Sequence, residues 1–457
     1  MVGYTAISSY VQQNEQKLLQ ELLDFLRIPS VSTLPEHKDD VLRAAEFTAA
    51  ALRAAGMPHV EIIETEGHPL VYAESLQAPG KPTILCYGHY DVQPPDPLEL
   101  WKSPPFEPVV ENGNIYARGS ADDKGQFYTH IKAVEALQQL DGKLPLNVKF
   151  LIEGEEEIGG KSVAKFVAEN AEKLQADVAL VSDTALFAPG LPTLCIGLRG
   201  LVYMEVEATG PSRDLHSGLY GGAAPNAVYG IIQLLGRAKD THGTILIPGI
   251  YDTVRPPAEA ELESWKTLPY DEAAYLNEVG SSALTGEPGR STFEKTWARP
   301  TFEVHGIAGG FTGTGAKTVI PAKAVAKVSM RLVPDQDPQV VVTAFRKWIE
   351  AHAPEGVNIE VRVLSGGRGL LVNPDHPAIA VAARCFEDSL GKKTVFVRSG
   401  GSIPIVGDFA QHLGIPTILM GFGLPDDGLH SPNEKFATAN YFNGIITVAH
   451  FFEQYGA

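Results

Sequence analysis

Apolar residues in the first two hundred positions recur with helical and strand periods in turn. Leu18, Leu22 and Leu26 are four residues apart, which predicts an amphipathic helix that ends before Pro29. A second helix is predicted from about 40 to 55. The elements predicted beyond it alternate: strand 82–88, helix 124–140, strand 147–152, helix 161–174 and strand 177–182. This βαβ alternation favours an α/β domain with a mostly parallel sheet and helices on both faces.

The pattern changes after Gly200. The elements predicted there are a half-exposed strand at 201–208, a helix at 226–238, strands at 301–307 and 323–333, a helix at 338–352 and a strand at 358–364. This β-α-β-β-α-β order indicates an α+β, ferredoxin-like sandwich with antiparallel strands. The earlier alternation then resumes with helix 376–390, strand 394–397, helix 405–413, strand 416–419 and helix 439–454. We therefore expect an inserted domain at 202–366, within a first domain made of 1–201 and 367–457.

Composition narrows the possible partners. The 37 basic and 55 acidic residues give a formal charge of -18, which argues against nucleic acid or an anionic membrane as a partner. The three cysteines, Cys86, Cys195 and Cys385, lie among apolar neighbours and are expected to be buried free thiols. Because the sequence shows no signal peptide and no apolar run of transmembrane length, we expect a cytoplasmic protein.

Histidines and carboxylates follow several predicted strands. His89 and Asp91 stand at the end of strand 82–88, two residues apart and therefore on the same side. Asp122 precedes a predicted helix. Further candidates follow the later strands: Glu155, Glu156, Glu157, Asp183 and His430. Each alone is typical of a solvated surface, but imidazoles and carboxylates at convergent strand ends, without cysteine, indicate zinc, manganese or cobalt.

Several motifs together resemble a known family. They are His89-Tyr90-Asp91, Gly119-Ser120-Ala121-Asp122-Asp123-Lys124-Gly125, Glu156-Glu157, Asp183, Asp214-Leu215-His216-Ser217-Gly218, Gly315-Ala316-Lys317-Thr318-Val319-Ile320-Pro321, Arg331-Leu332-Val333-Pro334, Gly400-Gly401-Ser402-Ile403-Pro404 and His430-Ser431-Pro432-Asn433-Glu434. Their order, from about residue 10 to the end, is similar to that of the dinuclear-metal peptidases and amidohydrolases. Within that family the sequence most resembles the carnosinase and cytosolic non-specific dipeptidase branch.

The resemblance implies two divalent metal ions in each subunit, zinc first, with manganese and cobalt as alternatives. The implied ligands are His89, Asp122 and Asp183 for one ion, and Asp122, Glu157 and His430 for the other. Asp122 would bridge the ions and Asp91 would hold His89. Glu156 would be the general base that activates the attacking water.

The acidic run leaves one alternative open. A shift by one residue would make Glu155 the base and Glu156 the ligand. We prefer the later pair because Gly159 matches the glycine that follows the family's Glu-Glu after one residue. The resemblance also implies a cis peptide between Asp122 and Asp123.

The inserted domain is implied to act as a lid and to form a homodimer. In relatives, the histidine that matches His216 reaches the partner's active site and stabilises the oxyanion there. Arg331, Thr318 and Ser402 resemble the residues that hold the substrate's carboxylate and backbone, and an arginine fork suits a carboxylate. The helix at 226–238 is the expected dimer interface.

These features predict a metal-dependent dipeptidase that acts on small peptides. An amidohydrolase of N-acyl amino acids is the first alternative, of aminoacylase, desuccinylase or carboxypeptidase type. Asp123 favours the dipeptidase, because aminoacylases and desuccinylases often carry an apolar residue there. Gln126 departs from the proline that carnosinase relatives often have. A binding module without activity is the second alternative, but every expected ligand and base position is filled.

Overall fold

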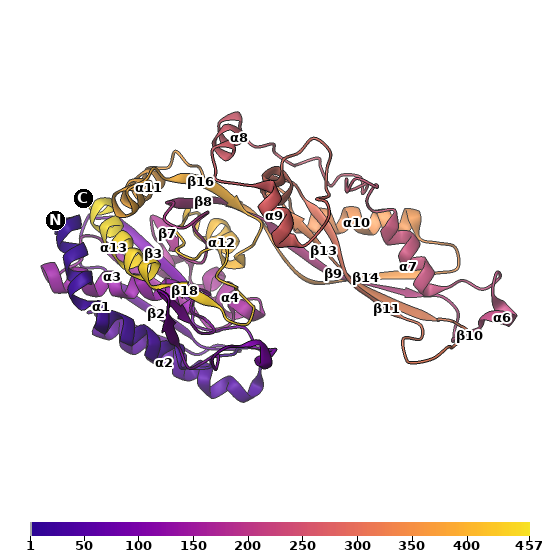
Figure 1. Ribbon diagram of the computed structural model, residues 1–457, viewed down its shortest axis with the longest axis horizontal. Helices are drawn as coiled ribbons and strands as arrows, with labels where there is room; N and C mark the ends of the chain where they lie inside the picture. Colours follow the sequence, from indigo (N-terminus) through magenta and orange to yellow (C-terminus); the bar gives the residue numbers. More distant parts are fainter. Residues whose placement is uncertain (1) are drawn as a thin grey trace. The chain divides into compact units, whose positions relative to one another are not determined.

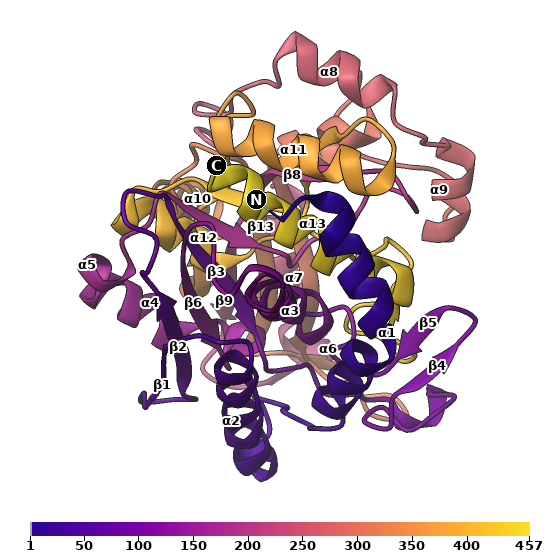
Figure 2. The same cartoon turned by 90° about the vertical axis from the view of Figure 1, so that its left-hand side faces the viewer.

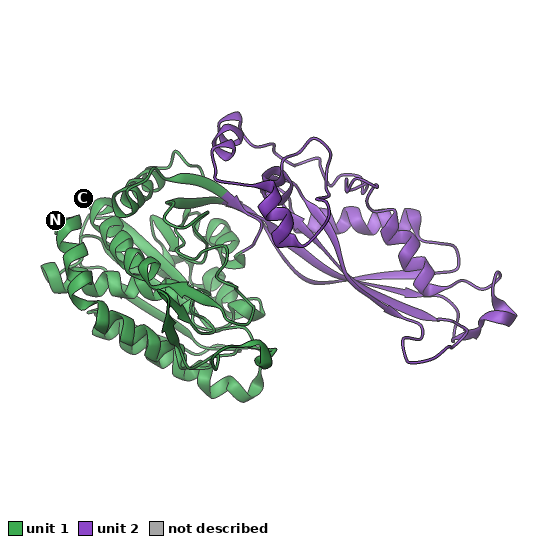
Figure 3. Cartoon of the chain, in the orientation of Figure 1, with its two compact units in different colours: residues 1–196, 372–397, 403–457 green, residues 197–371, 398–402 purple. Residues whose placement is uncertain are grey.

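A computed structural model describes residues 2–457, which form two compact units (Figure 3). Unit 1 consists of residues 1–196, 372–397 and 403–457, and unit 2 consists of 197–371 and 398–402. Unit 2 extends beyond both ends of the 202–366 range that the sequence indicated. The reason is that its two ends pair with each other, Leu198 opposite Leu370 and Gly197 opposite Leu371.

The largest sheet is mixed and has nine strands in the order β1-β2-β6-β3-β7-β17-β8-β15, with β16 paired to β8, and most of its strands belong to unit 1 (Figure 1). The strands are β1 His59–Ile63, β2 Leu70–Ser75, β3 Thr83–His89, β6 Asn147–Glu153, β7 Val178–Val181, β8 Thr193–Leu198, β15 Leu370–Leu371, β16 Val395–Ser399 and β17 Thr417–Leu419. The four central strands, β6, β3, β7 and β17, are parallel to one another. The outer pairs, which include β1 with β2 and β8 with β15, are antiparallel. The predicted parallel-centred α/β architecture is confirmed.

Every residue of β6 and of β7 is buried, because helices cover both faces of this sheet. The long helices are α1 Tyr4–Leu26, α2 Lys38–Ala54, α3 Lys124–Asp141, α11 Pro377–Leu390 and α13 Thr438–Tyr455. α3 packs against both α1 and α13 (Figure 2), so its first fourteen residues, Lys124 to Leu137, are all buried. The single helix predicted at 161–174 is two, α4 Lys161–Glu169 and α5 Ala171–Leu174, which are separated at Asn170.

A small three-stranded sheet joins two segments that are distant in sequence. Its order is β18-β5-β4, and the strands are β4 Val109–Glu111, β5 Asn114–Tyr116 and β18 Lys435–Ala437. β5 and β18 are antiparallel, with Tyr116 opposite Lys435. The chain just before Asp122 therefore lies beside the chain just after His430.

Unit 2 contains a four-stranded antiparallel sheet in the order β11-β13-β9-β14. Its main elements follow the predicted β-α-β-β-α-β order: β9 Gly200–Thr209, α7 Ala227–Gly236, β11 Thr301–Gly309, β13 Lys323–Leu332, α10 Pro338–His352 and β14 Asn358–Gly367. Buried and half-buried residues alternate along β9, since α7 and α10 pack on one face of the sheet only. Smaller elements complete the unit: β10 Leu215–His216, α6 Ser217–Tyr220, α8 Glu259–Lys266, α9 Glu272–Val279 and β12 Val319–Ile320.

Two expectations about single residues and segments can be checked against this fold. Cys86, Cys195 and Cys385 are all buried, as their apolar neighbours predicted. Within residues 2–457, no helix combines the length and the apolar character that crossing a membrane requires.

Candidate metal centre

His89 is the last residue of β3 and is fully buried. Its Nδ1 lies 3.1 Å from the backbone carbonyl oxygen of Asp91. Because a carbonyl oxygen can only accept, Nδ1 carries the proton and Nε2 has a free lone pair. Nε2 is buried without a hydrogen bond of good geometry, although it lies 3.1 Å from Oδ1 of Asp122. A ring nitrogen held in this tautomer is suited to bind a metal ion.

Asp91 contacts His89 through both its backbone and its side chain. The carbonyl of Asp91 accepts the hydrogen bond from His89, and the carboxylate lies 3.4 Å from Nδ1. The carboxylate also accepts the backbone N–H groups of Glu156 at 3.3 Å and Glu157 at 3.2 Å. Asp91 therefore joins the end of β3 to the short helix η3, Glu156–Ile158, which follows β6.

The predicted ligands lie in two groups that share one residue. His89, Asp122 and Asp183 form the first group, and Asp122, Glu157 and His430 form the second, with ligand atoms in each group all within 4.8 Å of one another. Oδ2 of Asp122 is 2.9 Å from Nε2 of His430, which in turn is 3.3 Å from Oε2 of Glu157. The peptide between Asp122 and Asp123 is cis, as predicted.

The fold explains why these residues meet. His89 ends β3, and Glu157, Asp183 and His430 follow β6, β7 and β17; these four are adjacent parallel strands of the sheet. The carboxyl ends of parallel strands are where open α/β sheets place their sites. His430 has a φ of 57°, a left-handed conformation that turns its loop back toward β18.

The acidic run is divided by geometry. Glu155 is 7% exposed and accepts hydrogen bonds from the backbone N–H groups of His68 and Ser162, each at 3.0 Å. Glu157 belongs to the second metal group, where its Oε2 also accepts a 2.8 Å hydrogen bond from Nε2 of Gln93. Glu156 lies in neither group. This arrangement favours Glu156 over Glu155 as the base and Glu157 as the ligand.

The charges at the site favour cations. Burial, together with the charges of Asp122 and Asp123, raises the pKa of Asp183 well above its ordinary value. Burial also raises the pKa of Glu156 to about 7, with Glu157 adding to the shift. Burial opposes ionisation of Asp122 as well, but the His430 and His89 side chains beside it outweigh burial and lower its pKa. Three carboxylate ligands and two imidazoles fit two divalent ions of the zinc, manganese or cobalt type.

Unit 2 holds the predicted substrate residues in two places. Nη1 of Arg331, on β13, donates a 2.9 Å hydrogen bond to Oγ of Ser402. His216 and Thr318 are neighbours at the β10–β12 pair, where the N–H of Ser217 donates to the carbonyl of Thr318 at 3.1 Å. His216 is exposed, and its Nδ1 accepts the N–H of Gly218 at 3.0 Å, which leaves Nε2 to act as a donor.

Sequence reasoning missed two polar residues that lie near the candidate metal ligands and the predicted substrate residues. Gln93 holds Glu157, as described above. Arg199 follows β8, and its Nε donates to the carbonyl of Gly400 at 3.0 Å. Burial and the charge of Arg331 lower the pKa of Arg199 to about 10. A charged residue directly after the apolar strand 193–198 was the available signal for Arg199.

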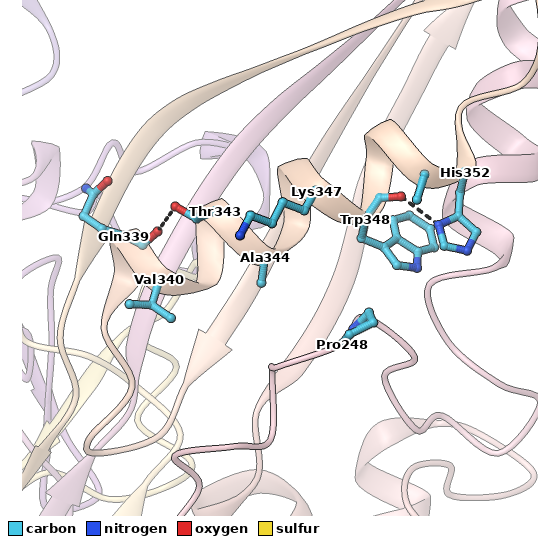
Figure 4. A pocket seen from close by; sticks show the side chains of 9 residues that line it. Pro248, Gln339, Val340, Thr343, Ala344, Lys347, Trp348 and His352 are labelled. Carbon is cyan, nitrogen blue, oxygen red and sulfur yellow. Dashed lines mark hydrogen bonds between the residues drawn. The ribbon is translucent and has the colours of Figure 1, made fainter.

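A groove elsewhere in unit 2 has a different character. It measures about 500 Å³ and lies along α10 (Figure 4). Its lining is mostly apolar and contains none of the predicted site residues: Pro248, Gln339, Val340, Thr343, Ala344, Lys347, Trp348, Ala351 and His352. The chemistry of the protein therefore points to the strand ends of unit 1 and not to this groove.

A parallel-centred sheet with two metal groups at its strand ends, interrupted by an antiparallel unit, defines a dinuclear metallohydrolase. The model of peptidase family M20/M25/M40 matches residues 85–454. The chain belongs to this family, which confirms the resemblance found in its motifs. It is therefore a metallopeptidase, a hydrolase of peptide bonds.

Similar sequences match over nearly the whole chain. The chain is 32% identical to the Cys-Gly metallodipeptidase DUG1 of Candida albicans over 470 residues, 98% of this chain and 96% of the relative. It is 30% identical to the Beta-Ala-His dipeptidase of Homo sapiens over 463 residues, 98% of this chain and 91% of the relative.

Two solved structures are similar throughout. The di-peptidase Dug1p of Saccharomyces cerevisiae is 29% identical, with a TM-score of 0.85 over 100% of this chain and 99% of that chain. An M20 family metallo-carboxypeptidase from Sulfolobus solfataricus is 31% identical, with a TM-score of 0.87 over 96% of this chain and 99% of that chain.

Proposed function

We propose that the protein is a dipeptidase that hydrolyses the peptide bond of dipeptides with two divalent metal ions. The observation that carries the proposal is Asp122, which is shared by two ligand groups at the strand ends. Relatives that match along their whole length are named dipeptidases, which supports dipeptides as the substrate class. His89 and Asp183 would hold one ion, and Glu157 and His430 the other.

The proposed chemistry divides between the ions and the side chains. When bound, the two ions would polarise the substrate carbonyl and lower the pKa of the attacking water. The Glu156 carboxylate takes the water's proton and later gives it to the leaving amine nitrogen. Asp91 fixes the backbone of Glu156 and so keeps this carboxylate in place.

Unit 2 contributes the residues that bind the rest of the substrate. Nε2 of His216 donates to the oxyanion of the tetrahedral intermediate. Arg331 and Ser402 are hydrogen-bonded to each other and take the substrate's carboxylate, which two guanidinium N–H groups can bind at once. Thr318, next to His216, holds the substrate backbone.

We expect dipeptide cleavage to require metal. Protein stripped by a chelator should lose turnover of a dipeptide panel, and reloading separately with zinc, manganese and cobalt should restore it, with zinc as the proposed native ion. N-acetyl and N-succinyl amino acids are the comparison substrates. Faster turnover of these, or of longer peptides from their carboxyl end, would replace the dipeptidase with the amidohydrolase or carboxypeptidase alternative. The similarity to the Sulfolobus solfataricus metallo-carboxypeptidase is the observation in favour of the carboxypeptidase alternative.

A homodimer is part of the proposal. Large apolar side chains are exposed on α6 and α7, among them Leu219 at 78%, Tyr229 at 58% and Ile232 at 50%. Tyr229 and Ile232 are three positions apart on α7, and exposed apolar residues grouped in this way favour contact with another protein surface. In the proposed dimer, His216 completes the active site of the partner subunit.

Mixing two inactive variants tests this arrangement. His216→Ala should lower turnover by about 10²–10³-fold, as expected when an oxyanion donor is lost. Glu156→Ala should be inactive in its own subunit. A hybrid dimer of the two contains one site with both groups, so mixing should restore part of the activity. If hybrids form and activity stays absent, the cross-subunit role of His216 is wrong.

The compartment and the class of partner complete the proposal. We place the protein in the cytoplasm, which is consistent with Cys86 and Cys385 being buried free thiols. The net charge of -18 makes small peptides, rather than nucleic acid, the expected partners.

A further inference from the structure

Glu434 is a buried carboxylate for which the proposed chemistry has no use. It is 0% exposed and lies four residues after His430, at the end of the same loop. Its Oε2 accepts Nη1 of Arg118 at 2.7 Å and the backbone N–H of Gly119 at 2.9 Å. Its Oε1 accepts the backbone N–H groups of Ala121 at 2.9 Å and Asp122 at 3.1 Å. Four donors therefore converge on one side chain.

These contacts hold the turn that presents Asp122. A buried backbone N–H without a partner is destabilising, so three of them that donate to one carboxylate fix the path of the turn. Residues 117 to 123, which lead into α3, are in no helix or strand, so several of their backbone N–H groups bind the Glu434 side chain instead. A backbone hydrogen bond also joins this turn to the end of the His430 loop: the N–H of Ala117 donates to the carbonyl of Glu434 at 3.2 Å.

Gln126 makes an independent connection of the same kind. Its Nε2 donates to the carbonyl of Ala121 at 2.7 Å, and its Oε1 accepts the N–H groups of Phe422 at 2.7 Å and Gly423 at 3.1 Å. Phe422 and Gly423 begin the loop after β17, and Glu434 ends it.

We propose that Glu434 and Gln126 form a clamp that positions Asp122 against the loop carrying His430, and so sets the affinity of the second metal ion. Asp122 and His430 come from segments more than three hundred positions apart, and both are in the second ligand group. A carboxylate that must serve two groups needs its backbone fixed on both sides. The clamp residues act through Asp122 and His430, so they are positioning residues. This inference rests on the proposed two-metal function.

The test measures metal binding rather than turnover. Glu434→Gln replaces one acceptor oxygen by an amide donor that faces N–H groups, and Gln126→Leu removes the other connection without changing charge. Titration of each folded variant with zinc, against a competing chromophoric chelator, should show one of the two sites losing about 10–100-fold in affinity. Excess zinc should then restore turnover, because Glu156 is untouched.

Glu453→Gln is the matched control. Glu453 is also buried, at 1% exposed, and accepts the backbone N–H of Gly3 at 2.9 Å, but it lies on α13 and contacts no ligand. It should lower the melting temperature while both zinc affinities stay unchanged. Clamp variants that behave like this control, with a lower melting temperature and unchanged affinities, would overturn the proposal.

Two further outcomes are decisive. If Glu434→Gln does not fold, Gln126→Leu alone decides, because it leaves the Arg118 pair intact. Unchanged zinc affinity in a folded Gln126→Leu would then reject the clamp. A wild-type protein that binds no zinc, manganese or cobalt would contradict the proposed function as well, so the two failures are distinguished by the wild-type titration.

Discussion

Asp122→Asn is expected to remove both metal ions and nearly all activity. The two carboxylate oxygens of Asp122 face different partners, Oδ1 toward His89 at 3.1 Å and Oδ2 toward His430 at 2.9 Å. Asparagine offers one oxygen and no charge, so neither ligand group stays complete. Loss of several kcal/mol of charge stabilisation corresponds to a rate decrease of at least about 10⁴-fold. Metal content of the purified variant and turnover of a dipeptide measure the two effects.

The control for this prediction is Asp388→Asn. Asp388 is another carboxylate paired with a histidine, at 3.0 Å from Nε2 of His450, but it lies on α11. This variant should bind two ions and keep wild-type turnover. The assignment of Asp122 as a bridge is wrong if Asp122→Asn still holds two ions.

Glu156→Gln should separate metal binding from proton transfer. The amide keeps the shape of the side chain and cannot take the water's proton, so turnover should fall by about 10²–10⁴-fold. Both ions should remain, since Glu156 is in neither ligand group. Comparison of metal content with the turnover of a saturating dipeptide tests the prediction.

Glu155→Gln is the matched control one residue earlier. Glu155 binds the N–H groups of His68 and Ser162, so this change should cost stability with little effect on the rate. The reverse pattern, with Glu156→Gln losing metal and Glu155→Gln losing the rate, would mean that the base and ligand are each one residue earlier.

Long periodic segments were predictable from sequence. The Leu18–Leu26 segment has the apolar spacing of a helix, and 82–88 is a short apolar run typical of a buried strand; both are present, as α1 and β3. The βαββαβ order of unit 2 was predictable for the same reason. The antiparallel β1–β2 pair was not predicted, because its outer strand is only half buried and shows no clear alternation.

The site was predictable in its residues but not in its connections. The ligands follow strands, so order along the chain places them at one edge of the sheet. The bonds from Asp91 to Glu156 and from Gln93 to Glu157 depend on loop paths that no periodicity encodes. Gln126 was visible as a departure from the family's proline, but its three partners are brought close only by the folded loop.

Unit 1 is made of segments that lie before and after unit 2 in the sequence, and this sets an order for folding during synthesis. β17 lies between β7 and β8, so both strands have an open edge until residue 417 leaves the ribosome. At about 5–20 residues per second, the interval from residue 181 to 417 is on the order of ten to fifty seconds. During that time the first ligand group has all three residues, while the second still lacks His430. The sheet and the second ligand group can therefore be completed only after β17 and the loop that carries His430 have been made.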